Sequence, residues 1–341
     1  MSGVGGQQQP GAPGAPDHPL SLARPGRKPQ AGADERMTEP RGRRETPAGR
    51  GVQVRDGDTP AMAREPLSQP LVVKLGGRAL EAPGALTECA AALREAGLSG
   101  LSARALLVVH GGGAEVTEWC KRAGLEARFA GGLRVTDAPT LEIAAAVLAG
   151  LANKRLVAAL RARGLDAVGL SALDGGTVRV TRHPEAQVLG EVGAVQAVDT
   201  SLLLSLLASG RTPVLASLGD DGAGALLNLN ADDVAAAVAA AIPAHDLLLL
   251  SDTPGLKLGG RVVRSLSPAA LADALEHPEV TGGMLPKLRA AQDALQAGVR
   301  RVHIAAWQGP GTISAVLEGT AVATTCFAAS LPPAAHEESH V

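Results

Sequence analysis

The sequence has almost no aromatic residues. Its 341 residues include no tyrosine, two phenylalanines and two tryptophans, together 1% of the chain. Proteins that bind single-stranded nucleic acid without sequence preference stack bases on aromatic side chains, so this composition argues against that function. The formal net charge is only −2, which gives no general attraction to nucleic acid or anionic membranes. Any recognition of phosphate must be local, and we expect a small-molecule partner.

Cysteine is also scarce. Cys89, Cys120 and Cys326 are the three cysteines, and none belongs to a C-x-x-C pair. This spacing argues against a zinc site and against a disulfide framework. Few, scattered cysteines suit a reducing compartment, so we expect a cytoplasmic protein.

Long uninterrupted apolar runs are missing. The longest apolar stretches, 235–243 and 247–250, are interrupted by Pro243, His245 and Asp246, whereas a membrane span needs roughly 20 apolar residues. No apolar segment of a signal peptide follows the start. We therefore expect neither membrane insertion nor export. The apolar content of 45% is nevertheless ample for a core.

Residues 1–69 differ from the rest of the chain. They are rich in Gly, Pro, Gln and Arg, with charges of both signs and no apolar periodicity, a composition typical of disorder. The acidic residues and prolines count against a targeting helix built on the arginines. We therefore expect a disordered extension over 1–69 and a flexible tail over 329–341.

From residue 69 onward, strand patterns alternate with helix patterns, which is typical of an α/β fold with a largely parallel sheet. Strands are expected at 71–75, 106–109, 167–170, 177–181, 213–216, 247–250 and 301–304. Helices are expected at 115–123, 141–160, 200–208, 231–241 and 285–297. A further helix around Leu86 and Leu93 is expected to be capped by Gly97. A boundary near Pro243 divides the ordered part into an N-terminal lobe, 70–242, and a C-terminal lobe, 243–328.

Two of these strands run into glycine-rich turns. LVVKLGG at 71–77 carries Lys74 into a turn formed by Gly76 and Gly77, and VVHGGG at 108–113 ends in a glycine triplet. Exposed backbone N–H groups in such turns bind phosphate, and a neighbouring ammonium adds a point charge. Neither turn matches G-x-x-x-x-G-K-[ST] or G-x-G-x-x-G, so no standard NTPase or dinucleotide site is indicated. A glycine triplet alone is more often a tight connection, but its pairing with Lys74 favours a binding cleft.

Polar residues cluster before the helix at 231–241. LLNLNADDVA at 226–235 places Asn228, Asn230 and Asp232 at alternating positions, where their side chains can share one face. A helix N-cap explains one of the three. Lys287 in GMLPKLRAA stands near a helix start, where the helix dipole disfavours a cation. It is either an ordinary surface lysine or a lysine positioned for chemistry.

Two further segments carry candidate binding residues. GGLRVTD at 131–137 contains Arg134, which is either a solvated loop arginine or a bidentate partner for a carboxylate. LLLLSDTPGL at 247–256 reads as a buried strand that ends in Ser251 and Asp252. The carboxyl end of a parallel strand is a natural place for a ligand.

The motifs KLGG, VHGGG, GLRVT, LNLNAD, LSDTPGL and GMLPK occur in this order. Over about 71–327 they resemble the amino acid kinase family, and most of all its acetylglutamate kinases. The resemblance implies a three-layer αβα sandwich with a largely parallel open sheet and two lobes, the N-terminal lobe binding the acylamino acid and the C-terminal lobe binding ATP. It implies ATP-dependent phosphorylation of the side-chain carboxylate of N-acetyl-L-glutamate, in arginine biosynthesis. Mg²⁺ is expected to arrive on ATP oxygens and water, with no metal site of the protein's own.

The resemblance also assigns the site residues. Lys74 and Lys287 match the two transition-state lysines of the family, and Asp232 matches the aspartate that holds them. The substrate-binding positions are Gly112, Gly113, Arg134, Asn228 and Asn230. The nucleotide-binding positions are Gly76, Gly77, Ser251, Asp252, Gly255, Leu256, Lys257, Val280 and Thr281. Pro286 and Asp233 depart from the family pattern, without removing a catalytic group.

Two other functions of the same fold stay open. One is a kinase for aminoadipate or glutamate attached to an amino-group carrier protein, which would need a basic surface for its partner. The other is a non-catalytic sensor, against which the presence of both lysines argues. Arginine-inhibited relatives carry a helical N-terminal extension, whereas residues 1–69 lack helical periodicity. We therefore expect a homodimer without strong arginine inhibition.

Overall fold

A computed structural model describes residues 70–77, 80, 84–98, 104–321 and 324–328. All of these belong to one compact unit, Pro60–Val341. The expected disordered extension, 1–69, and the expected flexible tail, 329–341, lie outside the described residues.

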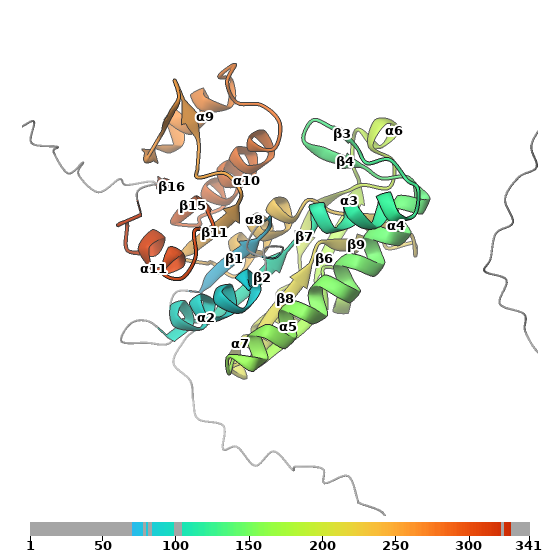
Figure 1. Cartoon of the computed structure of the whole chain (residues 1–341), viewed down its shortest axis with the longest axis horizontal. Helices are drawn as coiled ribbons and strands as arrows, with labels where there is room; N and C mark the ends of the chain where they lie inside the picture. The colour runs from blue at the N-terminus through green and yellow to red at the C-terminus, as the bar shows by residue number, and fades with distance from the viewer. Residues whose placement is uncertain (1–69, 78–79, 81–83, 99–103, 322–323, 329–341) are drawn as a thin grey trace, which may run out of the picture. The chain divides into compact units, whose positions relative to one another are not determined.

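An eight-stranded sheet forms the centre of this unit, in the order β14-β16-β15-β11-β1-β2-β8-β5 (Figure 1). The strands are β1 (Leu71–Leu75), β2 (Leu106–His110), β5 (Ala167–Ser171), β8 (Thr212–Ala216), β11 (Asp246–Ser251), β14 (Ser265–Leu266), β15 (Arg301–Ala306) and β16 (Thr324–Ala328). The six strands from β15 to β5 are parallel to their neighbours, and β16 runs antiparallel to β15. The carboxyl ends of β1, β2 and β11 therefore meet at one edge of the sheet, in the middle of the strand order.

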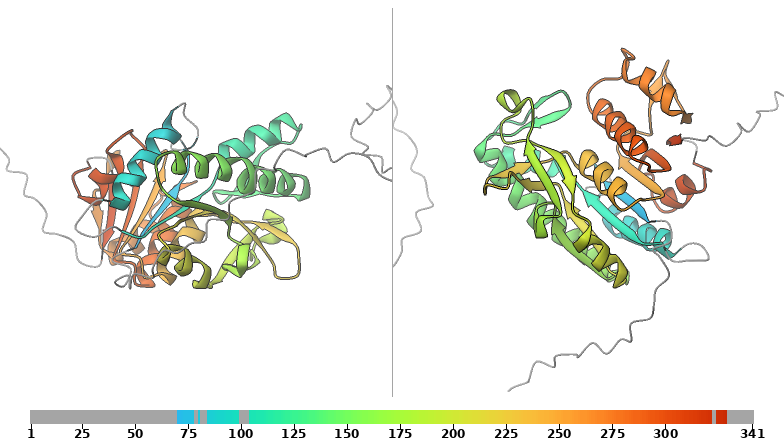
Figure 2. Two further views of the ribbon diagram at one scale, coloured as in Figure 1. Left: turned by 90° about the horizontal axis from the view of Figure 1, so that it is seen from below. Right: turned by 180° about the vertical axis from the view of Figure 1, so that it is seen from behind.

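Helices cover both faces of this sheet, as the two views of Figure 2 show. They are α2 (Ala85–Leu98), α3 (Gly113–Arg122), α4 (Ala138–Ala145), α5 (Asn153–Ala162), α6 (Ala186–Leu189), α7 (Ser201–Ala208), α8 (Ala231–Ala241), α9 (Pro268–Leu275), α10 (Met284–Gln296) and α11 (Thr312–Leu317). Alternation along β1 divides the core, because Leu71 and Val73 pack with α2, α5 and α11 while Val72 packs with α7, α8 and α10. The predicted α/β fold with a mostly parallel sheet between helices is confirmed.

Short antiparallel hairpins lie outside the main sheet, and most of them are not predicted by the sequence patterns. They pair β3 (Arg128–Ala130) with β4 (Leu133–Val135), β6 (Val178–Arg182) with β7 (Gly193–Val198), β9 (Leu218–Asp220) with β10 (Leu226–Asn228) and β12 (Lys257–Leu258) with β13 (Arg261–Val262). Of these strands, the sequence predicts only the one at 177–181. The β3–β4 and β9–β10 hairpins carry residues of the candidate active site.

The helix expected at 141–160 is one continuous helix from Ala138 to Ala162. Its middle, Ala146–Ala152, has π-helical hydrogen bonding. By length and composition alone this helix is able to cross a membrane. One such helix is weak evidence for a membrane protein, because core helices of soluble proteins pass the same test.

The predicted helix cap at Gly97 was also wrong. The α2 helix continues through Gly97 to Leu98. A Cβ atom placed on Gly97 would lie 3.8 Å from Leu106, so Gly97 instead lies where α2 passes close to β2.

Cys89 and Cys120 are buried and Cys326 is partly buried, and all three are free thiols, as expected for ordinary packing residues.

Candidate active site

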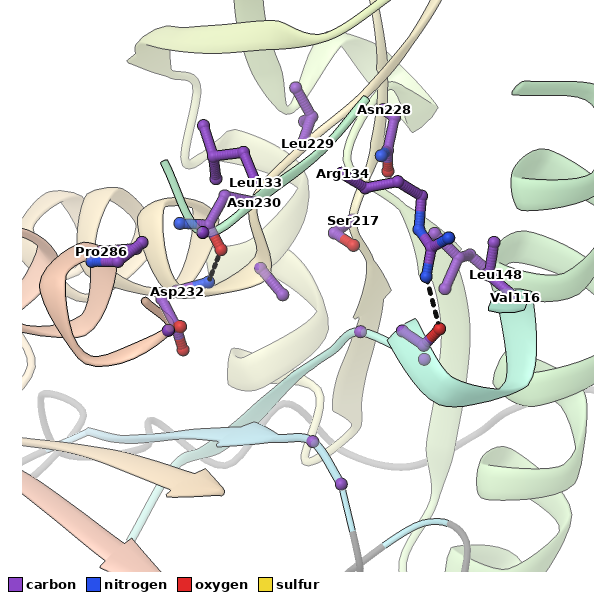
Figure 3. Close-up of a pocket in the computed structure, with 18 of the residues that line it drawn as sticks. Val116, Leu133, Arg134, Leu148, Ser217, Asn228, Leu229, Asn230, Asp232 and Pro286 are labelled. Carbon is purple, nitrogen blue, oxygen red and sulfur yellow. Dashed lines mark hydrogen bonds between the residues drawn. The ribbon is translucent and has the colours of Figure 1, made fainter. Parts of the chain in front are cut away.

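A cavity of about 310 Å³ opens at the carboxyl ends of β1 and β2 and at the starts of α3, α8 and α10. Figure 3 shows side chains that line it, among them Val116 of α3, Arg134 of β4, Asn228 of β10, Asp232 of α8 and Pro286 of α10. It brings together eleven residues that the sequence predicted for the site: Lys74, Gly76, Gly77, Gly112, Gly113, Arg134, Asn228, Asn230, Asp232, Asp252 and Lys287. Residues far apart in the sequence therefore share one cavity.

Two lysines meet one buried carboxylate on the cavity wall. Lys74 Nζ lies 2.9 Å from Asp232 Oδ1, and Lys287 Nζ lies 3.4 Å from Asp232 Oδ2. Burial alone would raise the pKa of Asp232, but the positive charges of both lysines outweigh it and lower that pKa. The aspartate is therefore ionised, and the three groups together carry a net positive charge that faces the cavity.

The first glycine turn is shaped around this charge cluster. A Cβ atom on Gly76 would lie 3.0 Å from Lys74 Nζ, so a larger side chain would displace the ammonium. Gly77 has a φ of 57°, which favours glycine. A Cβ atom there would collide with the carboxylate of Asp252, so Asp252 lies directly against this turn.

The second glycine turn begins helix α3. Gly112 is the N-cap of α3 and supplies no side-chain cap, and both Gly112 and Gly113 line the cavity. The first N–H groups of a helix have no partners within the helix, and the helix dipole adds positive potential there. This end of α3 is therefore suited to an anionic group.

Arg134 is held against the same helix start. Its Nη2 donates to the Gly113 carbonyl and to Thr117 Oγ1, both at 2.6 Å, and its guanidinium stacks on the ring of Phe129. The side chain is 9% exposed, and burial lowers its pKa. Among the described residues, Nη1 has no hydrogen-bond partner. A buried donor without a partner is costly, so this nitrogen is well placed for an anionic ligand.

The two asparagines have different local roles. Asn230 is the N-cap of α8, because its side chain accepts a hydrogen bond from Asp232 N, and its Nδ2 donates to Asp233 Oδ1. Asn228 Nδ2 donates to Thr136 Oγ1 at 3.1 Å. The N-cap interpretation therefore holds for Asn230, and Asn228 lines the cavity without capping α8.

Pro286 and the β3–β4 hairpin close one side of the cavity. Gly132, at the hairpin turn, has a φ of 85°, and a Cβ atom there would lie 2.8 Å from the Gly282 carbonyl and 3.1 Å from Pro286 Cγ. The hairpin thus touches the start of α10. Pro286 stands in the first turn of α10, where a missing N–H costs little, so it does not disturb the position of Lys287.

The remaining predicted nucleotide residues lie outside this cavity. Ser251 hydrogen-bonds with Thr253, and the N–H of Leu256 donates to Thr325 Oγ1. Leu256 and Val280 pack in the core, and Lys257 and Thr281 are exposed. Gly255, with a φ of 115°, packs against Thr325. The roles of these six positions stay predictions.

Sequence reasoning missed most of the apolar cavity wall. The apolar residues that line the cavity include Val116, Phe129, Leu133 and Leu148. Phe129 offered one signal, since it is one of two phenylalanines and precedes the GLRVT motif. The others look like ordinary core residues in the sequence.

The fold and this cavity define a member of a phosphotransferase family, and comparison with known proteins agrees. Residues 69–306 match the amino acid kinase family model, and the chain belongs to this family.

Individual relatives are similar over most of the chain. The acetylglutamate kinase of Chloroflexus aurantiacus is 43% identical over 71% of this chain and 94% of its own. That of Methanopyrus kandleri is 45% identical over 60% of this chain and 86% of its own. Among solved structures, smu.665 from Streptococcus mutans is 26% identical and superposes with a TM-score of 0.64, covering 76% of this chain and 98% of its own.

Proposed function

We propose that this enzyme is an acetylglutamate kinase, which transfers the γ-phosphoryl group of ATP to the side-chain carboxylate of N-acetyl-L-glutamate and so serves arginine biosynthesis. The observation that carries the proposal is the pair of lysines on Asp232 facing a cavity that Arg134 also lines, with an Nη1 that has no partner among the described residues. Positive charge of this kind suits a reaction in which ATP and a carboxylate, both anions, must approach each other. The two relatives described above are named acetylglutamate kinases.

The chemistry needs no general base, because the attacking carboxylate is already an anion. The barrier is electrostatic: two negatively charged groups must approach, and charge builds up on the migrating phosphoryl group. Lys74 and Lys287 supply positive charge from β1 and α10, and Asp232 holds both ammonium groups in place. Preorganised donors of this kind stabilise the transition state without reorganisation.

Arg134 and Asn228 would bind the α-carboxylate of the amino acid. Arg134 Nη1, which has no partner in the part of the chain that the structure describes, would donate to this group while Nη2 keeps its bonds to Gly113 and Thr117. The side-chain carboxylate would then lie at the start of α3, near Gly112 and Gly113. Apolar residues on the same wall suit the methylene groups and the acetyl group of the substrate.

ATP would approach from the C-terminal lobe. The Gly76–Gly77 turn is suited to a phosphate, since neither glycine carries a side chain of its own and Lys74 lies beside it. The adenosine part would contact the predicted positions around 251–257 and 280–281. Mg²⁺ would be held mainly by ATP oxygens and water, with Asp252 close by.

One assay tests the function. The purified full chain is given MgATP with N-acetyl-L-glutamate, with aminoadipate or with no acceptor, and any acyl phosphate is trapped with hydroxylamine as a hydroxamate. We expect hydroxamate with N-acetyl-L-glutamate alone. Product from neither free acceptor would contradict the proposal, and a carrier-bound acceptor would then be tested next.

We also propose a cytoplasmic homodimer without strong arginine inhibition. Strand β5 is an open edge of the sheet, and only 39% of the most apolar window of the Ala138–Ala162 helix is buried. An open strand edge and an exposed apolar helix favour a second subunit. Sedimentation equilibrium should give the mass of two subunits, and a mass of six would contradict this.

A further inference from the structure

A buried histidine lies directly beneath the second glycine turn. His110 is the last residue of β2 and is fully buried. Its Nδ1 lies 2.9 Å from the carbonyl oxygen of Gly111, and its Nε2 lies 3.0 Å from Nδ2 of Asn153. His110 does not line the cavity, whereas Gly111 does. The ring therefore contacts the back of the turn whose front faces the ligand.

The surroundings of Asn153 fix the tautomer of this ring. Asn153 Nδ2 also lies 3.2 Å from the Leu170 carbonyl and 3.0 Å from the Val214 carbonyl, while Asn153 Oδ1 accepts from Lys154. Carbonyl oxygens only accept hydrogen bonds, so the amide nitrogen must be the atom that faces them. Its two N–H groups therefore serve three acceptors, with one hydrogen shared, and His110 Nε2 is one of the three. Because an amide nitrogen does not accept hydrogen bonds, the ring proton lies on Nδ1.

His110 consequently donates to the Gly111 carbonyl. Burial lowers the pKa of His110 to about 4, so the ring is neutral near neutral pH and carries one proton for this bond. The carbonyl of a trans peptide and the N–H that follows it point in opposite directions. With the Gly111 oxygen held toward the imidazole, the N–H of Gly112 is turned the other way, away from the ring.

The π-helical segment places the other parts of this arrangement. Leu148, within Ala146–Ala152, lies 3.0 Å from the position of a Cβ atom on Gly112, and Asn153 comes directly after the segment. A Cβ atom on Gly169 would collide with Asn153 Oδ1, so strand β5 leaves room for the amide. Short π segments inside helices occur often at functional sites.

We propose that His110, held by Asn153, is a positioning residue that aims the Gly112 N–H at the acceptor carboxylate. This role rests on the proposed function, because it needs an anion in front of the turn. The alternative is a histidine that only fills the core. A positioning histidine and a core histidine respond differently to a substitution that removes the Nδ1 donor but keeps the volume.

Two substitutions test the roles of the two ring nitrogens of His110 separately. The amide of His110→Asn stands near the position of Nδ1 and is able to donate to Gly111, whereas the amide of His110→Gln reaches the position of Nε2 and leaves Gly111 without its donor. Removing a donor of the oxyanion-hole type lowers kcat about 10²- to 10³-fold. Misalignment of the Gly112 N–H in His110→Gln should therefore lower kcat at least about tenfold. His110→Asn should recover most of this loss.

Further readouts exclude a merely structural role. We expect the KM for ATP of His110→Gln to stay within about twofold of wild type, because ATP lies on the other turn. His303→Gln is the matched control: His303 is buried as deeply but contacts Asp246 at the start of β11, away from the cavity. Because its amide reaches the position of Nε2 and keeps a donor for Asp246, it should change the melting temperature little and leave kcat unchanged. Equal kcat in both His110 variants, or losses that track the melting temperature, would overturn the proposal.

The wild-type enzyme gives a test that needs no variant. Nitrogen-15 spectra of the histidine rings should show His110 as the neutral Nδ1–H form from pH 6 to 8, and an Nε2–H form or an imidazolium would overturn the proposal. An inactive wild type would instead mark failure of the proposed function. An active wild type with full activity in His110→Gln would mark failure of this inference alone.

Discussion

Among the described residues, two buried aspartates are surrounded by basic side chains, at opposite ends of the same parallel strands. Asp232 lies at the carboxyl ends, with Lys74 and Lys287. Asp246 begins β11 and faces Arg104, Arg301, His245 and His303. Both carboxylates are almost fully buried. Against the effect of burial, the charges of the two lysines lower the pKa of Asp232, whereas hydrogen bonds from His303, Arg301 and His245 lower the pKa of Asp246.

The two clusters differ in how completely their hydrogen bonds are satisfied. Both oxygens of Asp246 accept hydrogen bonds, including two from the fork of Arg301 at 2.6 and 3.1 Å. Asp232 contacts only the two ammonium groups, at 2.9 and 3.4 Å, and receives no arginine fork within the described part of the chain. Arginine forks fix a carboxylate rigidly, whereas lysine ammonium groups keep further donors for another ligand. We call the Asp246 cluster saturated, because arginine and histidine donors occupy both of its oxygens, and it stabilises the fold. We call the Asp232 cluster unsaturated, because its lysines keep donors for a ligand in the cavity, and it is suited to catalysis.

The largest expected effect is on stability, at the saturated cluster. Asp246→Ala leaves Arg301 and Arg104 without their buried partner, and breaking such a pair costs about 3–5 kcal/mol of unfolding free energy. Urea unfolding measures this loss. Asp166→Ala is the control, since Asp166 forms an exposed ion pair with Arg161 and should cost less than about 1 kcal/mol. Equal losses would show that the Asp246 cluster is not structural.

The next effect is on catalysis, at the unsaturated cluster. Lys287→Ala should lower kcat by about 10²–10³, or roughly 3–4 kcal/mol of transition-state stabilisation, while calorimetry still detects ATP binding. Lys121→Ala, an exposed lysine of α3, should leave kcat unchanged. Normal turnover in the Lys287 variant would refute its assigned role.

A smaller effect is expected on substrate binding. Arg134→Lys keeps the charge but loses the planar fork, and a hydrogen bond to a charged group is worth about 1.5–3 kcal/mol. The KM for N-acetyl-L-glutamate should rise about 10- to 100-fold, while the KM for ATP changes little. Arg122→Lys is a matched control, because Arg122 also stacks on an aromatic ring, that of Trp119, but lies outside the cavity. A rise in the KM for ATP alone would contradict the assignment of Arg134 to the amino acid site.

Long elements could be predicted from the sequence because their signals are local. Continuous apolar strands such as β1 and β11 and the periodic helices α8 and α10 lie within a few residues of their expected bounds. Hairpins of two- or three-residue strands, such as β3–β4 and β12–β13, were missed. Such strands are too short to show a period, and contacts made after folding determine them.

The site was predictable where chemistry leaves a short motif. Lys74, Asp232 and Lys287 stand in such motifs, and the structure brings them together. The contact between His110 and Asn153 spans 43 residues. It depends on the π segment and on the sheet register, neither of which has a local signature. Sequence reasoning therefore found the charged groups and missed the residues behind them.

The final prediction concerns Asp233, which is next to Asp232 in the chain but forms no ion pair with a lysine among the described residues. Burial, together with the charges of Asp232 and Asp293, raises its pKa from 3.8 to about 7. Between these two values the folded protein keeps a proton that the unfolded chain releases, so the free energy of unfolding falls as pH rises from about 4 to about 7. Above pH 7 this penalty is complete.

Asp233→Asn removes this titration and keeps the acceptor for Asn230. The variant should be more stable than wild type at pH 8 by at least about 1 kcal/mol, the equivalent of roughly one pKa unit, and the difference should vanish near pH 4. Urea unfolding at several pH values measures it, with the exposed Asp273→Asn on α9 as control. A difference that is independent of pH would mean that Asp233 is ionised throughout, and that Asp232 with its two lysines tolerates a second negative charge beside it.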